Sequence, residues 1–274
     1  MAWLRPKRLA WTPTVFTARS RAVHLCVMPQ KKWNVRTVGE LLGVLKQLRK
    51  ADDDFFWYRG HRNAKWPLIP SLFRPEHVSK QEMTLLKRFK QHSFPYLQRV
   101  PETEWEWLFL MQHFGLPTRL LDWTESPLVA LYFSLFPIGS PKEPDGAVWC
   151  LRPLALNKLA NYVDGLPAFG DDAVLRSYLS SITVGIETAA AKPLAILAPR
   201  AFPRLHAQHG VFTIFHRNKT PIDELGNHSH VTKLVIPASA KSKLRRELNF
   251  LLINELSMFP ELGKVSGRIN EISI

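Results

Sequence analysis

The sequence contains few cysteines and no long apolar run. Cys26 and Cys150 are the two cysteines in 274 residues, so a disulfide framework is not expected and a reducing cytoplasm is the predicted location. The longest apolar candidates, such as residues 128–136, fall well short of the roughly 20 residues that span a bilayer. We therefore predict a soluble protein that does not enter a membrane.

Acidic residues are scarce at the N-terminus. Residues 1–50 hold 11 lysines and arginines and a single acidic residue, Glu40, within a chain of net charge +14. We interpret residues 1–30 as a basic arm that is either disordered or the result of a start assigned too early, with Met28 as the true first residue. Residues 31–274 are predicted to form one domain. Because most of the excess charge lies in residues 1–50, a nucleic-acid partner is a secondary expectation.

A metal site is not predicted either. His206 and His209 form one short pair, and His228 and His230 form another. Neither pair is accompanied by the cysteines or carboxylates of a known zinc pattern. We interpret these histidines as loop or surface residues.

The apolar periodicity predicts an α+β protein. A spacing of three and four residues predicts helices, and short aromatic or β-branched runs predict strands. The predicted helices are residues 38–48, 76–97 with an interruption near Pro95, 105–115, 127–136 and 241–252. The predicted strands are residues 55–59, ending at Gly60, then 118–123, 147–151, 210–215 and 233–236. We expect a small central mixed or antiparallel sheet surrounded by helices, with a helical insertion around residues 153–204.

Two segments gather the residues that favour a polar pocket. Arginine, histidine, glycine and an acid lie between aromatic residues in both, at Tyr58, Arg59, Gly60 and His61 and again at Thr118, Arg119, Asp122 and Tyr132. The planar guanidinium of Arg59 could hold phosphate or ribose oxygens with directed hydrogen bonds. A flat ring could stack on Tyr132. The alternative is structural: Arg59 and Asp122 would pair in the interior, and Tyr132 would belong to the core.

These segments resemble the FRG domain family, which is named for an aromatic-Arg-Gly signature. The resemblance rests on four motifs in order, from about residue 35 to residue 268: residues 58–73, 113–133, 208–212 and 257–262. The motif order is also similar to that of NAD-dependent ADP-ribosyltransferases. This similarity implies a split central sheet and NAD as the ligand and substrate, without a metal. It implies ligand-binding roles for Tyr58, Arg59, Gly60, His61, Thr118, Arg119 and Tyr132, and catalytic roles for Arg59, Asp122 and Gln208.

The third motif departs from the transferase pattern. Transfer from NAD passes through a positively charged oxocarbenium-like state, which a carboxylate would stabilise. The chain has Gln208 at that place, which can orient a ribose hydroxyl but supplies no charge. Glu255 is a reserve candidate for the missing carboxylate.

Three hypotheses follow for the function. The first is a cytoplasmic protein that binds NAD or a related nucleotide in a cleft, with or without transfer of ADP-ribose to a protein or nucleic-acid acceptor, as a toxin or antiphage effector. The second is a nucleic-acid-binding module. Its contacts would be Lys31, Lys32, Arg36, Arg62 and Arg74 on phosphates and Trp57 or Trp66 on bases. The third is a non-catalytic interaction domain.

Overall fold

The computed structural model describes residues 32–49, 55–77, 81–136, 142–169, 173–179 and 191–265. The chain divides into residues 1–30 and residues 31–274, and every element described below belongs to the second unit. The predictions for the N-terminal arm therefore lie outside the described residues. No described helix has both the length and the apolar character needed to cross a membrane.

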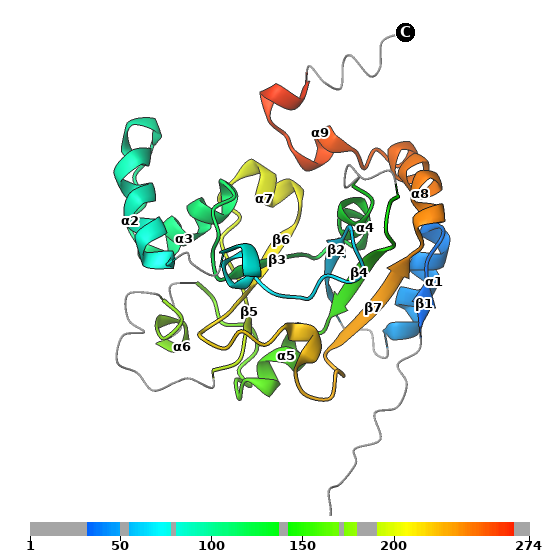
Figure 1. The fold of residues 1–274 in the computed structure, drawn as a ribbon, viewed down its shortest axis with the longest axis horizontal. Helices are drawn as coiled ribbons and strands as arrows, with labels where there is room; N and C mark the ends of the chain where they lie inside the picture. Colours follow the sequence, from blue (N-terminus) through cyan, green and yellow to red (C-terminus); the bar gives the residue numbers. More distant parts are fainter. Residues whose placement is uncertain are drawn as a thin grey trace, which may run out of the picture. The chain divides into compact units, whose positions relative to one another are not determined.

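A seven-stranded mixed sheet forms the centre of the described region (Figure 1). Its strand order is β1 (Trp33–Asn34), β7 (Val231–Ile236), β4 (Gly146–Leu151), β2 (Trp57–His61), β3 (Leu120–Thr124), β6 (Gly210–Ile214) and β5 (Leu194–Ile196). The pair β1 and β7 is parallel and the other pairs are antiparallel. The predicted α+β class and mixed sheet are confirmed. Strands β1 and β5 were not predicted, because each is only two or three residues long.

The sheet forks between β2 and β3. Strand β2 pairs with β4 along its whole length, and β3 does the same with β6. By contrast, β2 and β3 pair at one position, Tyr58 with Thr124. The sheet therefore consists of two halves, β1-β7-β4-β2 and β3-β6-β5, which diverge beyond this pair.

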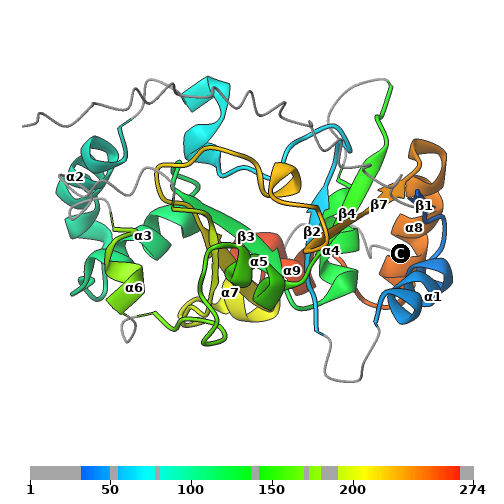
Figure 2. The same ribbon diagram turned by 90° about the horizontal axis from the view of Figure 1, so that it is seen from below.

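Helices α1 (Val38–Leu48), α4 (Pro127–Ser134) and α8 (Ala238–Phe250) pack on one face of the first half (Figure 2). The predictions for α1 and α4 are confirmed, including the cap of α4: Ser126 Oγ accepts a hydrogen bond from Val129 N at 3.4 Å, and Pro127 takes the first position. The opposite face carries the cluster of Trp57, Trp123, Trp149 and Phe215. Helix α5 (Pro153–Leu159) covers this cluster through Leu156 and Leu159.

Gly60 permits a close approach of α4 to β2. A Cβ at this position would lie 2.0 Å from the carbonyl oxygen of Ala130 and 2.6 Å from the amide nitrogen of Ser134. The prediction that Gly60 ends the strand is wrong, since β2 continues to His61. Arg59 accordingly lies inside the strand. The glycine is needed where the helix backbone crosses it.

The second half of the sheet is covered by α3 (Glu104–His113), α6 (Ala173–Arg176) and α7 (Pro203–Ala207). Helix α2 (Glu82–Ser93) packs against α3. Helix α3 matches its prediction, and Gly115 with φ of 75° follows it. The predicted helix 76–97 is shorter: residues 75–77 and 94–96 form single 3-10 turns, η2 and η3, on either side of α2. Pro95 explains the second interruption.

Candidate functional site

A cavity of about 490 Å³ opens at the fork between β2 and β3. Its walls come from the two strands, from α3 and α4, from the loop after β2 and from the region around α7. The polar lining residues are Arg59, His61, Arg62, Arg74, Gln112, His113, Asp122, Thr124, Arg204 and Gln208. The apolar lining is mostly aromatic: Tyr58, Trp66, Phe109, Trp123, Phe133, Phe136, Phe202 and Phe212. The fold thus brings together Tyr58, Arg59, Gly60, His61, Asp122 and Gln208 of the predicted site.

Two of the three guanidinium nitrogens of Arg59 are hydrogen-bonded within the described part of the chain, and the third is free to bind a ligand. Its Nε donates to His61 Nε2 at 3.0 Å, and its Nη1 donates to the carbonyl oxygen of Asp122 at 2.6 Å. Its Nη2 has no partner among the described residues. The side chain is 17% exposed. Burial lowers the pKa of Arg59 to about 10, against the raising effect of Asp122, so the guanidinium stays charged at neutral pH.

His61 is a buried strand residue, because β2 continues past Gly60. It is 3% exposed, and Arg59 Nε donates to its Nε2 at 3.0 Å. The proton of the neutral ring is then on Nδ1, which lies 3.2 Å from Trp149 Nε1 as a close contact. Burial first and the charge of Arg59 second lower its pKa to about 2, against a smaller raising effect of a hydrogen bond to the Trp66 backbone. The ring is therefore neutral at physiological pH. It orients Arg59 by accepting the Nε hydrogen bond.

Asp122 is the carboxylate of the cavity. Its Oδ2 accepts a hydrogen bond from Gln112 Nε2 at 2.7 Å and lies 3.8 Å from Arg59 Nη1. Thr118 Oγ1 in turn donates to Gln112 Oε1 at 2.5 Å. The expected pair of Arg59 and Asp122 forms, but the short hydrogen bond of Arg59 goes to the backbone. The carboxylate itself is about half exposed and faces the cavity.

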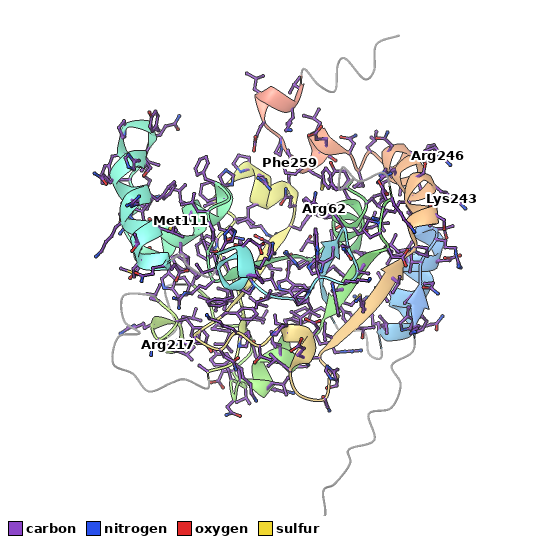
Figure 3. The ribbon with its side chains drawn as sticks, in the orientation of Figure 1. Arg62, Met111, Arg217, Lys243, Arg246 and Phe259 are labelled. Carbon is purple, nitrogen blue, oxygen red and sulfur yellow. The ribbon has the colours of Figure 1, made fainter. Side chains whose placement is uncertain are left out.

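Gln208 and the region of α7 form the opposite wall. Gln208 Nε2 donates to the carbonyl oxygen of Met258 at 3.0 Å, and Thr124 Oγ1 donates to the carbonyl oxygen of Gln208 at 2.6 Å. Arg204 lies over the ring of Phe259 at 4.6 Å, and Phe259 is labelled in Figure 3. The amide nitrogen of Gln208 is thus already bonded to the backbone beside helix α9 (Glu255–Met258).

His113 stacks on the α7 side of the cavity. Its ring lies 4.4 Å from that of Phe202, with the two planes 13° apart. Burial first, and the charge of Arg204 second, lower the pKa of His113. The neutral ring therefore extends the aromatic wall.

Three predicted ligand-binding residues lie outside this cavity. Arg119 is buried, with Nε 2.5 Å from Glu82 Oε2 and Nη1 donating to the carbonyl oxygen of Tyr178 at 2.7 Å. Thr118 is fully buried and reaches the cavity only through Gln112. Tyr132 lines a separate cavity of about 220 Å³ between α4 and α8. The reserve carboxylate Glu255 lines that second cavity too, where Lys264 Nζ lies 2.7 Å away.

Sequence reasoning missed several lining residues as members of this site. Arg62, Trp66 and Arg74 were predicted only as nucleic-acid contacts, although Arg74 directly follows the first FRG-like motif, residues 58–73. Arg62, labelled in Figure 3, lies over the Trp66 ring at 5.5 Å. Arg204 carries no local signal in the sequence. Trp57 is fully buried and cannot stack on a base, which leaves the exposed Trp66 as the stacking residue of the second hypothesis.

The lining carries excess positive charge. Arg59, Arg62, Arg74 and Arg204 face one carboxylate, Asp122. Such a site favours an anionic ligand, and the aromatic walls favour one with flat rings. Within the described ranges, no group of three or more histidine, cysteine or acidic side chains is placed to hold a metal ion.

The architecture is thus an α+β domain with a cationic, aromatic cavity at a fork in its sheet. The family model of the FRG domain matches residues 54–141, so this part of the chain carries an FRG domain. The match includes β2, β3 and α4, but the motifs at residues 208–212 and 257–262 lie beyond it. No curated protein and no solved structure matches the chain.

Proposed function

We propose that the cavity binds NAD or a related nucleotide. The observation that carries the proposal is Arg59: a largely buried guanidinium that lines the cavity, stays charged, and has Nη2 unpaired among the described residues. A buried donor of this kind is stabilised by a charged acceptor such as a phosphate. Arg74 contributes a second positive charge close enough to lower the pKa of Arg59.

The size and the walls of the cavity fit such a ligand. A volume of about 490 Å³ lies inside the range of roughly 300–1,000 Å³ for small-molecule sites. Phosphates would lie against the arginines, and the base or nicotinamide ring against Phe133, Trp66 or the stacked pair of His113 and Phe202. Asp122, about half exposed beside Arg59, could accept hydrogen bonds from ribose hydroxyls.

Transfer of ADP-ribose is the reaction that this ligand would allow. The C–N bond between ribose and nicotinamide breaks, nicotinamide leaves with the bonding electron pair, and the ribose carbon bonds to an acceptor nucleophile that loses a proton. Asp122 would stabilise the developing positive charge, since Gln208 is neutral and bonded to Met258. In the cytoplasm, such a reaction on a protein or nucleic acid would suit a toxin or antiphage effector.

Calorimetric titration with NAD and ADP-ribose tests the binding step. Loss of the charged hydrogen bonds in Arg59→Ala is expected to weaken affinity by roughly 10- to 100-fold. The matched control is Arg246→Gln on exposed α8, which should leave affinity unchanged. Equal affinities of wild type and folded Arg59→Ala would contradict the proposal. Nicotinamide release, compared between wild type and Asp122→Asn, tests transfer separately.

A further inference from the structure

Helix α2, the segment that follows it and the end of α3 carry an unusual combination of exposed side chains. Residues 83–100 contain Lys87, Arg88, Lys90 and Arg99 and no acidic residue. Exposed aromatic residues follow at Phe94 and Tyr96 and, from the end of α3, at Phe114. We call this the α2 surface, and define it by Lys87, Arg88, Gln91, His92, Phe94, Tyr96 and Phe114. Figures 1 and 2 both place α2 at the opposite end of the sheet from α8.

The polar residues of the α2 surface share one helix face. Lys87, Arg88, Gln91 and His92 have the three- and four-residue spacing of neighbours on a helix, and all four are exposed. Lys87 and Arg88 form no ion pair with any described residue. The acid of α2, Glu82, is buried with Arg119. The positive charge of this face is therefore not neutralised within the described part of the chain.

The remaining cations of the segment are already engaged. Arg99 Nη2 lies 3.4 Å from Glu102 and 3.6 Å from Glu106. Lys90 lies over the ring of Trp107 at 5.3 Å. For this reason neither residue is included in the α2 surface.

The aromatic residues are anchored on one side and open on the other. Tyr96 is 86% exposed, Phe114 62% and Phe94 53%. The ring of Phe94 lies 6.0 Å from that of Trp107, and the ring of Phe114 lies 6.3 Å from that of Phe89. Packing against α2 and α3 thus fixes two of the three rings. Three exposed aromatic rings, on and next to a helix that also carries unpaired cations, are a costly use of surface unless a partner covers them.

We propose that the α2 surface binds single-stranded nucleic acid. Lys87 and Arg88 would contact phosphates, and Tyr96, Phe94 and Phe114 would stack on bases. Charge complementarity selects a polyanion, and the rings select one whose bases are unpaired, because a duplex hides the base faces. The site lies beside the cavity, since the Phe114 ring is 5.0 Å from that of His113. The proposal does not depend on nucleotide binding in the cavity.

Fluorescence anisotropy with the full chain and a labelled oligo-dT first tests the contribution of Lys87 and Arg88 to binding. Lys87→Gln/Arg88→Gln is compared with Lys243→Gln/Arg246→Gln, which removes the same charge from exposed positions on α8 (Figure 3). The first pair should flatten the dependence of log affinity on log salt by about 1.4, roughly 0.7 for each lost contact with a single-stranded phosphate. The α8 pair should leave the slope nearly unchanged. An equal effect of both pairs would overturn the proposal, because only non-specific charge would then matter.

Stacking is tested without a change in charge. Loss of one stacked base in Tyr96→Ala should weaken oligo-dT binding by roughly 5- to 100-fold, while binding of heparin, a polyanion without bases, stays the same. Circular dichroism and denaturant titration confirm an intact fold. Unchanged oligo-dT affinity of Tyr96→Ala, equal affinity for duplex DNA, or the same variant effects on vesicles of anionic lipid would each overturn the assignment.

Discussion

Arg59 and Arg119 both pair with a carboxylate, but their guanidinium groups are satisfied to different degrees. All three nitrogen atoms of Arg119 have partners: Nε and Nη2 lie 2.5 Å from Glu82 Oε2, and Nη1 donates to Tyr178. Arg59 lies 3.8 Å from its carboxylate, and its Nη2 has no partner among the described residues. A closed pair of this kind holds elements together, whereas an open one can bind a ligand.

The two pairs also differ in what they join. Glu82 begins α2, so its pair with Arg119 fixes that helix against the start of β3. Glu82 Oε1 further accepts a hydrogen bond from the Arg119 backbone nitrogen at 3.1 Å. Arg59 and Asp122 instead lie on the two strands that diverge at the fork. The closed pair is part of the scaffold, and the open pair lines the cavity.

Breaking the closed pair of Arg119 and Glu82 should have the largest effect on stability. Arg119→Met leaves Glu82 buried without its partner, and this should lower the free energy of unfolding by about 3–5 kcal/mol. Denaturant titration measures the loss. Adding Glu82→Gln removes the unpaired charge but keeps an acceptor for the Arg119 backbone, so the double variant should recover part of the stability. A loss below about 1 kcal/mol, the value of a surface ion pair, would show that the pair is not closed in solution.

The distinction between the two arginines could not be predicted from the sequence. Both lie next to aromatic or apolar residues, and both occur in the FRG-like motifs. What separates them is Glu82, a residue far from both in sequence whose local pattern predicted only the interior of a longer helix. The cap of α4, in contrast, was predictable because Ser126 and Pro127 act on their own helix. Local signals identify elements, but the partners of a charged side chain depend on long-range packing.

The same limit explains why the burial of His61 and the α7 wall of the cavity could not be predicted from the sequence. A glycine normally ends a short strand, so Gly60 suggested a turn, and the crossing of α4 that requires it is a tertiary contact. His61 is therefore buried against Trp149. Arg204 reaches the cavity from a five-residue helix in a region whose composition gives weak signals. About two thirds of the lining residues lie within the recognised motifs, and long-range packing brings in the remainder.

The pH dependence of stability sharpens the comparison, because it tests whether neutral His61 holds Arg59. His61 has a lowered pKa when folded and an ordinary pKa of about 6.5 when unfolded. The unfolded chain therefore binds the proton first, and stability is lost as pH falls below about 6.5, by up to about 1.4 kcal/mol per pH unit for this group. His61→Gln should reduce the slope of unfolding free energy between pH 6 and pH 5. His92→Gln, at an exposed position of α2, is the control and should leave the slope close to that of wild type. If both variants give the wild-type slope, His61 is not a buried neutral acceptor.

The smallest effect on stability is expected at the open pair. Arg59→Met removes a cation that is desolvated, near Arg74, and 3.8 Å from a carboxylate that is itself about half exposed. Asp122 keeps its solvent contact and its hydrogen bond from Gln112, so no buried charge is left unpaired. Buried His61 Nε2 loses its donor, which costs about 1–3 kcal/mol, but the desolvation of Arg59 and its repulsion with Arg74 are relieved. The free energy of unfolding should therefore fall by less than about 2 kcal/mol. Denaturant titration beside Arg119→Met measures the contrast. A loss for Arg59→Met equal to that for Arg119→Met would mean that both arginines are scaffold residues, and the cavity would then lose the residue on which its proposed ligand depends.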